Sequence, residues 1–322
     1  MNGFNPLLLV AAGVAVLLFL MFAAIVSRRS TGRGLEPPDP RPDPLQAAPS
    51  LTPSPAPVTP PADRPPYGAW RLIERNLANP DSAGGPLYRL RFMPEGELLQ
   101  WRPGAVARIY CGPAAEIFSP DGSGASPAGD YMIGSLPSDN TLDLMVRLAV
   151  GQAVGEQERS RWLCQGIETG QRVAIALRDD PSFQPPPDHV PMILIGNAIG
   201  IAGLMTHIKA RPEGTRNWLI FGDRNCADDP ILAAEVSEWV TSGHLERCDL
   251  VFPREGEEQR LVIDQIEDSR DPLLDWALAG AAIYVCGSAR MGDDVDAAFA
   301  RLLGPEVLVE MAQAGLYRRS IY

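Results

Sequence analysis

Hydrophobic and polar positions follow different patterns in successive regions of the chain, and the first region is the most apolar. Residues 1–27 carry no charged side chain, and residues 6–26 are apolar almost throughout. A membrane-spanning helix needs about 20 such residues, whereas the apolar part of a cleaved signal peptide has about 7–15 and follows a basic segment. Here the basic residues Arg28, Arg29 and Arg33 come after the apolar run. This order favours a transmembrane anchor over residues 1–27 with a cytoplasmic C-terminal side, and a signal peptide is the alternative.

Proline dominates the next region, residues 28–66. Thirteen of the chain's 32 prolines lie between Pro37 and Pro66, mixed with Ala, Ser, Asp and Arg. Such a segment has too little apolar content to form a core and extends by about 3 Å per residue. We expect a semi-rigid linker that carries the folded body away from the anchor.

Residues 67–187 show short β segments separated by glycine and proline. Residues 142–148 alternate leucine or valine with other residue types, which is the period-2 pattern of a strand with one buried face. Several such strands at this spacing predict a small antiparallel β barrel. The predicted strands are residues 87–92, 106–110, 131–134, 142–148 and 173–177.

The pattern changes in residues 188–322, where buried strands alternate with helices. This alternation is typical of a doubly wound parallel sheet in an α/β domain. Asp229-Pro230 and Asp271-Pro272 are typical of an N-cap followed by proline at the first helical position. The predicted strands are residues 192–195, 218–221, 250–252 and 282–285, and a helix is predicted over residues 204–210.

Residues 191–203 combine a buried strand with a glycine turn that leads into a helix. The turn contains Gly196, Gly200 and Gly203. In nucleotide-binding α/β proteins, such a turn presents backbone N–H groups and a helix N-terminus to a phosphate. An ordinary βα turn is the alternative, so this stretch alone does not decide between them.

Charge and cysteine content narrow the function classes. The net charge of −12 argues against nucleic acid as a partner, because phosphate binding draws on clustered Lys and Arg. The five cysteines include no Cys-x-x-Cys pair, and the three histidines are far apart. This pattern favours reduced thiols in a cytosolic setting and makes a metal site improbable.

Motifs spread over residues 89–322 resemble the C-terminal half of the diflavin reductases, the family of the sulfite reductase flavoprotein subunit, within the ferredoxin–NADP reductase-like superfamily. The resemblance implies an FAD-binding barrel at residues 67–187 and an NAD(P)-binding domain at residues 188–322. It also implies a membrane-anchored bacterial form without the FMN domain, held in the inner (cytoplasmic) membrane with its soluble part in the cytoplasm. The motifs are Asp130-Tyr131-Met132-Ile133-Gly134-Ser135, Ser160-Arg161-Trp162-Leu163, residues 195–202, Phe221-Gly222-Asp223-Arg224, Phe252-Pro253-Arg254-Glu255, Tyr284-Val285-Cys286-Gly287 and the terminal Tyr322.

The resemblance assigns FAD contacts to the barrel and to the C-terminus. Tyr131 matches the aromatic residue that packs on the flavin ring, and Tyr322 matches the C-terminal aromatic residue that covers its opposite face. Ser135 belongs to the same motif as Tyr131 and is a predicted cofactor contact. Ser160 matches the hydroxyl that binds the FAD pyrophosphate.

The resemblance also assigns nicotinamide contacts. Gly196 and Gly200 let the backbone approach the dinucleotide phosphates, Arg224 matches a pyrophosphate contact, and Arg254 matches a 2′-phosphate contact. Cys286 matches the cysteine beside the reacting carbon of the nicotinamide, which makes Cys286 and Tyr322 the predicted catalytic residues. A solvent-exposed arginine, or a cysteine acting only as a small buried side chain, is the alternative at these positions.

Several family residues are replaced, and the replacements leave two functions open. The first is a membrane-anchored oxidoreductase that passes electrons from NADPH or NADH through FAD to a separate acceptor protein or a heme-bearing membrane protein. The second is a degenerate copy with weak or no cofactor binding that acts as a binding or scaffold subunit. The replaced positions are Gly129, Met132, Ala198, Ile199, Pro253, Gln259, Leu261 and Ser320.

Overall fold

The structure is a computed structural model that describes residues 67–80, 85–97, 100–112, 128–150, 154–222, 230–252 and 260–322. The predicted anchor and linker lie outside these ranges. Among the described helices, none is long and apolar enough to cross a membrane. Residues 61–322 form one compact unit, which contains two sheets.

The first sheet is antiparallel and has the strand order β4-β3-β6-β1-β2-β5. A bridge between Ile133 and Leu144 connects the two edges of the sheet, so it curls into a barrel with one buried cluster inside. The elements of this part are β1 (Gly68–Asn79), β2 (Leu87–Pro94), β3 (Val106–Tyr110), β4 (Ala128–Met132), β5 (Leu142–Arg147), α3 (Val154–Arg161), β6 (Arg172–Arg178) and the short helices Pro137–Asp139, Trp162–Gly166 and Pro181–Phe183.

The predicted barrel strands are present, but the predictions missed β1 and misplaced part of β4. The strand β1 alternates apolar residues with arginine and glutamate and crosses two register shifts, which weakens its period-2 signal. In β5, Asp143 is buried although it lies on the predicted polar face. Its carboxylate accepts hydrogen bonds from Arg89 and Arg91 of β2, and these bonds compensate the loss of solvent.

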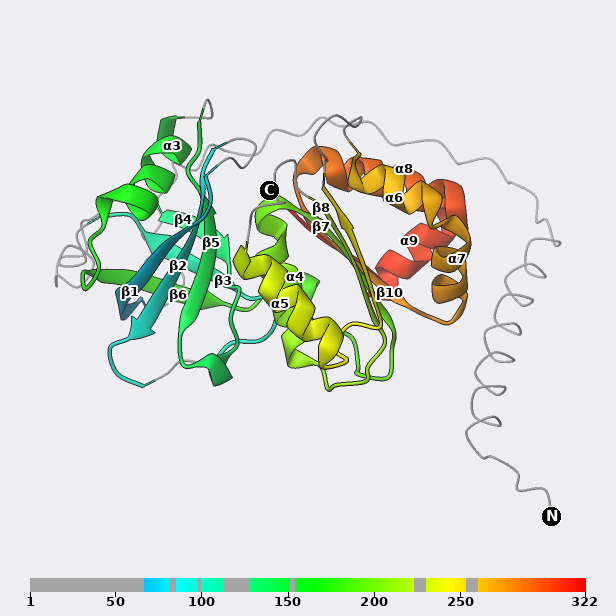
Figure 1. The fold of residues 1–322 in the computed structure, drawn as a ribbon, viewed down its shortest axis with the longest axis horizontal. Helices are drawn as coiled ribbons and strands as arrows, with labels where there is room; N and C mark the ends of the chain where they lie inside the picture. The colour runs from blue at the N-terminus through cyan, green and yellow to red at the C-terminus, as the bar shows by residue number, and fades with distance from the viewer. Residues whose placement is uncertain are drawn as a thin grey trace, which may run out of the picture. The chain divides into compact units, whose positions relative to one another are not determined.

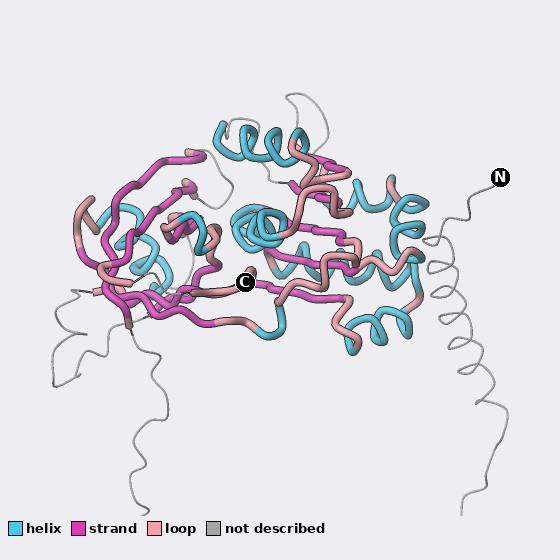
Figure 2. Tube along the Cα trace, turned by 90° about the horizontal axis from the view of Figure 1, so that it is seen from below, coloured by secondary structure: helices cyan, strands magenta, loops and turns pink. Residues whose placement is uncertain are grey.

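The second sheet is fully parallel and has the order β11-β10-β7-β8-β9. Helices cover both faces, as the doubly wound pattern predicted (Figure 1; Figure 2). The elements are β7 (Met192–Asn197), a short helix Ala198–Gly200, α4 (Ile201–Ala210), β8 (Asn217–Gly222), α5 (Pro230–Thr241), β9 (Arg247–Val251), α6 (Val262–Asp268), α7 (Arg270–Leu278), β10 (Ala282–Gly287), α8 (Ala289–Leu303), α9 (Pro305–Gln313) and β11 (Tyr317–Ile321).

Each face of the parallel sheet has its own hydrophobic cluster. Leu194, Leu219 and Tyr284 pack against α4 and α5 on one face. Ile195, Ile220 and Val285 pack against α6, α7 and α8 on the other. Because successive side chains of a strand point to opposite faces, strands buried on both faces are apolar throughout, which is why the sequence predicted β7, β8 and β10. The edge strands are only partly buried: β9 begins three residues before the predicted 250–252, and β11 was not predicted.

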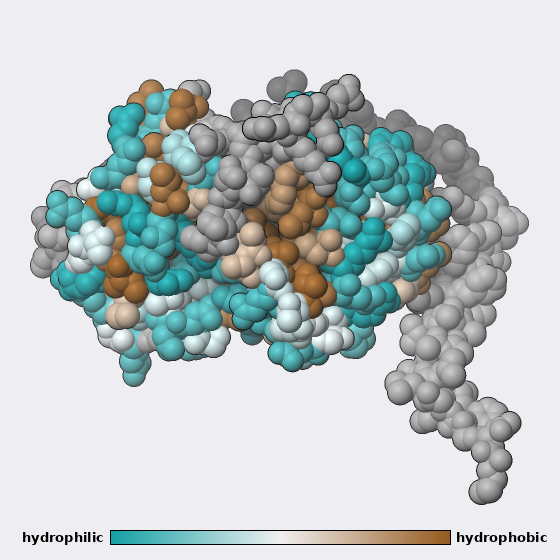
Figure 3. Space-filling view, in the orientation of Figure 1, coloured by the Kyte–Doolittle hydropathy of each residue, from teal (hydrophilic) through white to brown (hydrophobic). Residues whose placement is uncertain are grey.

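The helix α4 lies between the barrel and the parallel sheet, and its first eight residues are all buried. The Thr206 hydroxyl accepts a hydrogen bond from the Gly104 backbone of the barrel. On the nearby α5, Glu235 accepts one from Arg89 of β2. Apolar side chains gather at the surface over the region of α4 and α5 (Figure 3).

The predicted N-cap at Asp271 is wrong. The helix α7 begins at Arg270, after Ser269. Only Ser269 separates α7 from the end of α6 at Asp268. Ser269 is therefore the N-cap, and the helix begins one residue before the predicted N-cap Asp271. Pro272 is tolerated because it lies in the first turn, where a backbone N–H has no helical partner. Asp229 lies outside the described residues.

Candidate functional site

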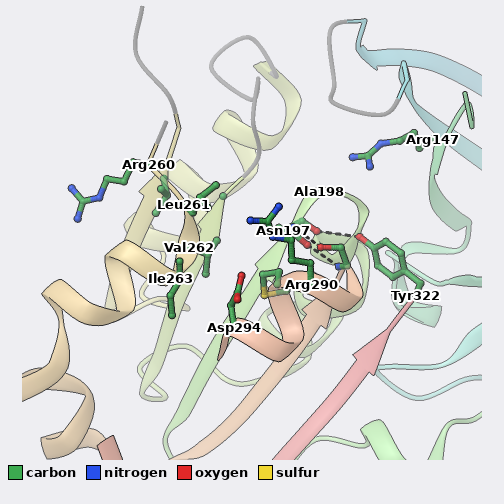
Figure 4. A pocket seen from close by; sticks show the side chains of 14 residues that line it. Arg147, Asn197, Ala198, Arg260, Leu261, Val262, Ile263, Arg290, Asp294 and Tyr322 are labelled. Carbon is green, nitrogen blue, oxygen red and sulfur yellow. Dashed lines mark hydrogen bonds between the residues drawn. The ribbon is translucent and has the colours of Figure 1, made fainter. Parts of the chain in front are cut away.

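A cavity of about 290 Å3 opens at the carboxyl ends of the parallel strands β7 to β10. In open α/β sheets, ligands bind at this edge. One wall is formed by Leu261, Val262 and Ile263, the facing wall by Tyr322, and the floor between them by Asn197 and Ala198 (Figure 4). The cavity therefore has an apolar side and a polar side that carries the glycine turn.

The glycine turn after β7 donates to an oxygen atom at this cavity. The backbone N–H of Gly200 donates to the phenolic oxygen of Tyr322 at 3.0 Å, and that hydroxyl donates to the Asn197 carbonyl at 3.2 Å. The Tyr322 backbone N–H also donates to the Gly287 carbonyl. The turn therefore accommodates an oxygen ligand, which is what a dinucleotide phosphate requires.

The glycines of the turn are required by close packing. A Cβ atom at Gly200 would lie 2.1 Å from the Cys286 carbonyl oxygen, and one at Gly196 would lie 2.8 Å from the same oxygen. The turn thus packs directly on the backbone of β10. Asn197 strengthens this contact, because its side chain donates to the Ser288 hydroxyl and accepts from the Ser288 backbone N–H.

Ala198 has a φ of +52°, in the left-handed region that favours glycine. The turn therefore keeps a backbone conformation typical of glycine although alanine stands at position 198. The replacement adds local strain to the turn.

Three arginines reach the cavity from different elements. Arg147 comes from the end of β5, Arg260 precedes α6, and Arg290 lies in the first turn of α8. The Arg260 guanidinium is bound to Asp268 and Gln265. Arg290 is exposed and forms no hydrogen bond or ion pair with the described residues. It is the cavity cation best placed to neutralise a phosphate.

Cys286 does not line this cavity. It lies on the α4 side of β10, is fully buried, and is paired in register with Ser320 of β11. Burial raises the pKa of the thiol to about 12, and the neighbouring Ser320 hydroxyl partly opposes the rise. The thiol is therefore protonated at neutral pH and acts as a small packing group rather than as a nucleophile.

Tyr131 lies in the barrel, half buried, with its ring folded over Gly129. A Cβ atom at Gly129 would lie 2.8 Å from the ring. Burial raises the pKa of Tyr131, and the positive charge of Arg159 on α3 is among the influences that oppose the rise. The Arg159 guanidinium folds back along α3, 3.4 Å from the position of a Cβ at Gly155. An aromatic ring and a cation are thus combined at this end of the barrel.

The hydroxyls of the two predicted serines are used by the backbone around them. Ser160 accepts from the Ala149 N–H and donates to the Gln157 carbonyl. Ser135 accepts from the Asp143 N–H and donates to the Thr141 carbonyl. Both are buried, and their assignment as cofactor contacts stays a prediction.

Arg224 and Arg254 lie outside the described residues. The described part of the chain contains no group of three or more His, Cys, Asp or Glu side chains placed to hold a metal ion. The sequence analysis missed Arg290 and Arg159. A signal for Arg290 was its position three residues after Gly287 at the end of a predicted strand, and a signal for Arg159 was its i+4 spacing from Gly155.

Comparison with known proteins gives a consistent set of relatives, although no family model matches the chain. The sulfite reductase [NADPH] flavoprotein alpha-component of Vibrio vulnificus is 32% identical over 215 residues, covering 60% of this chain and 34% of the relative. The corresponding proteins of Vibrio cholerae and Mannheimia succiniciproducens are each 30% identical, over 60% of this chain and 34% and 36% of their own lengths. The chain spans about a third of the length of these relatives.

The relatives and the fold agree. An antiparallel barrel followed by a parallel sheet with a ligand-sized cavity at its strand ends is the arrangement that the motifs predicted. The chain is therefore similar in sequence and in architecture to the FAD/NADP half of the diflavin reductases, within the ferredoxin–NADP reductase-like superfamily.

Proposed function

We propose that the chain is an NAD(P)H-dependent flavoprotein oxidoreductase that binds FAD and passes electrons to a separate acceptor protein. The observation that carries this proposal is the hydrogen bond from the Gly200 backbone to the phenolic oxygen of Tyr322 at the strand-end cavity, which Arg290 also lines without a partner among the described residues. A dinucleotide phosphate satisfies both the N–H group and the cation. The relatives are named as NADPH-dependent flavoproteins, which supports the same cofactor class.

In this proposal the adenosine end of the dinucleotide lies against the apolar wall formed by Leu261 and Val262. Arg290 neutralises the phosphates, and Tyr322 leaves the Gly200 N–H when they bind. The guanidinium of Arg260 is held by Asp268, which limits its use for a 2′-phosphate. Discrimination between NADPH and NADH therefore rests on Arg254 and is expected to be weak.

On the barrel side, the Tyr131 ring packs on the flavin, and Arg159 provides a positive charge for the FAD pyrophosphate. Arg159 thereby takes the role of the family arginine that is absent at position 129. FAD held by these residues would supply hydride acceptance from the dihydronicotinamide and single-electron release. The chain's own residues bind, orient and shield the reacting rings.

We further propose that residues 1–27 anchor the protein in the inner (cytoplasmic) membrane and that residues 28–66 carry the folded part toward its acceptor. The acceptor class is a redox protein or a heme-bearing membrane protein. The apolar run and the proline-rich composition support this arrangement.

The test is purification of the full chain in detergent, followed by measurement of flavin content, FAD uptake and flavin reduction by NADPH and NADH. A yellow protein that both nucleotides reduce supports the proposal. A colourless protein that takes up no FAD overturns it.

A second candidate, a reductase-fold binding subunit, is favoured by one observation. The helix α3 carries Glu156 and Glu158 four and two residues before Ser160, whose hydroxyl is already satisfied by the backbone. These carboxylates oppose binding of a pyrophosphate. A chain that binds a nicotinamide dinucleotide but no flavin would support this candidate.

A further inference from the structure

One small cluster closes the junction between the barrel and the parallel sheet. Cys286 and Ser320 lie side by side on neighbouring strands, and Gly203 of α4 faces them. A Cβ atom at Gly203 would lie 3.0 Å from the Cys286 sulfur. The three residues form the side of the junction that the parallel sheet and α4 provide.

Met132, from the barrel strand β4, is the outer cover of this cluster. The Ser320 hydroxyl donates to the Met132 sulfur at 3.6 Å. The Met132 methyl group would lie 2.7 Å from a Cβ at Gly203, so it contacts the helix backbone directly. Met132 is half buried, whereas Cys286 beneath it is fully buried.

The space between Met132 and the sheet is too narrow for a planar ring. A ring stacked between two groups needs about 7 Å between them, twice the usual contact distance of about 3.5 Å. The separation between the Ser320 oxygen and the Met132 sulfur is half of that. A nicotinamide ring that follows the glycine turn toward Cys286 therefore meets the thioether of Met132.

We propose that Met132 is a gate between the two halves of the site. Its side chain must rotate away before a nicotinamide ring can lie between Cys286 and a flavin bound to the barrel. Methionine suits this role because it has three rotatable bonds and adapts to irregular spaces. The inference rests on the proposed function, and it names Met132 as a positioning residue that limits access to the junction.

The rate at which the Cys286 thiol is chemically modified measures access past Met132, and no cofactor is needed for this measurement. We expect that iodoacetamide modifies Cys286 of the native full chain slowly and that Met132→Ala accelerates this modification at least tenfold, as measured by mass spectrometry of the Cys286 peptide. The matched control is Met145→Ala, because Met145 of β5 is also half buried and packs against the same hydrophobic cluster. Equal rates in the wild type and Met132→Ala, or equal acceleration in both variants, would overturn the gate.

A second measurement links the gate to the chemistry. In Met132→Ser, stopped-flow measurement should show faster flavin reduction by NADPH at an unchanged dinucleotide dissociation constant, because the smaller side chain clears the junction without touching the phosphate site. A chain that takes up no flavin overturns the proposed function. A chain whose flavin is reduced equally fast with Met132 or with serine at this position overturns the gate alone.

Discussion

The phenolic oxygen of Tyr322 accepts a hydrogen bond of 3.0 Å from the backbone N–H of Gly200. Tyr322 thus accepts the hydrogen bond that the turn after β7 would otherwise offer to a ligand. Its position depends on β11, which adds to the sheet beside β10 and carries the terminus to the glycine turn. A ligand oxygen that binds Gly200 must replace this hydroxyl.

Tyr322→Phe should therefore strengthen dinucleotide binding. The variant keeps the ring but loses the oxygen that occupies Gly200, and a hydrogen bond contributes about 0.5–1.5 kcal/mol. We expect a dissociation constant for NADP+ that is about 2- to 10-fold lower by isothermal titration calorimetry. Tyr88→Phe in the barrel is the control and should bind as the wild type does. Weaker binding by Tyr322→Phe would contradict the competition between the hydroxyl and phosphate.

Arg290→Gln should weaken dinucleotide binding because it removes a cavity cation that has no partner among the described residues. A charge-assisted hydrogen bond contributes about 1.5–3 kcal/mol, which corresponds to a loss of about 10- to 150-fold. The loss should shrink at high salt, because exposed charges are screened. Arg301→Gln is the matched control: it lies on the same helix, but its guanidinium pairs with Glu267. A similar loss in both variants would point to net charge rather than to a site.

Arg159→Gln should weaken FAD uptake by about tenfold or more, because the variant removes the cation beside Tyr131. Quenching of flavin fluorescence during titration with FAD measures this affinity. Arg161→Gln on the same helix serves as the control, since Arg161 is exposed two residues farther along α3. If Arg159→Gln takes up FAD as tightly as the wild type, Arg159 does not replace the arginine missing at Gly129.

Ala198→Gly should stabilise the fold. Ala198 holds a φ of +52°, which costs a residue with a Cβ atom about 1 kcal/mol or more, and part of the gain is lost to the greater freedom of glycine in the unfolded chain. We expect the free energy of unfolding in urea to rise by up to about 1 kcal/mol. Ala202→Gly, in the buried helix α4, should show the opposite sign by at least about 0.5 kcal/mol. A destabilised Ala198→Gly would mean that packing of the methyl group outweighs the backbone strain.

His207 should make stability depend on pH. It is fully buried among Phe183 and Tyr284, and neither ring nitrogen has a hydrogen-bond partner among the described residues. Burial, together with the positive charges of Arg211 and Arg318, lowers its pKa to about 3. Since the unfolded histidine binds a proton near pH 6.5, stability is full above that pH and falls as the pH drops toward 3.

The expected slope from this group approaches about 1.4 kcal/mol per pH unit below pH 6.5. Urea unfolding between pH 5 and pH 7 measures the slope. His207→Leu should remove this contribution, and His189→Gln, at an exposed position, should keep it. An unchanged slope in His207→Leu would show that another group controls acid stability in this range.

The amino-acid sequence determined the architecture. Alternation in residues 142–148 and the apolar runs of the parallel strands predicted two kinds of sheet, because strand burial on one face or on both faces leaves a period in the sequence. The positions of Tyr131, Gly200, Cys286 and Tyr322 in their motifs identified the superfamily. The strands β1 and β11, the start of β9 and the start of α7 were missed because local signals there compete with tertiary packing.

Only the tertiary structure decided how the candidate site is arranged. Register pairs Cys286 with Ser320, the barrel brings Met132 over both, and β11 delivers Tyr322 to Gly200. These residues lie up to 190 positions apart in the chain, from Met132 to Tyr322. Their contacts come from the docking of the barrel on α4 and from strand order, which local periodicity does not encode. The sequence thus determined which elements form, and long-range packing determined which side chains meet.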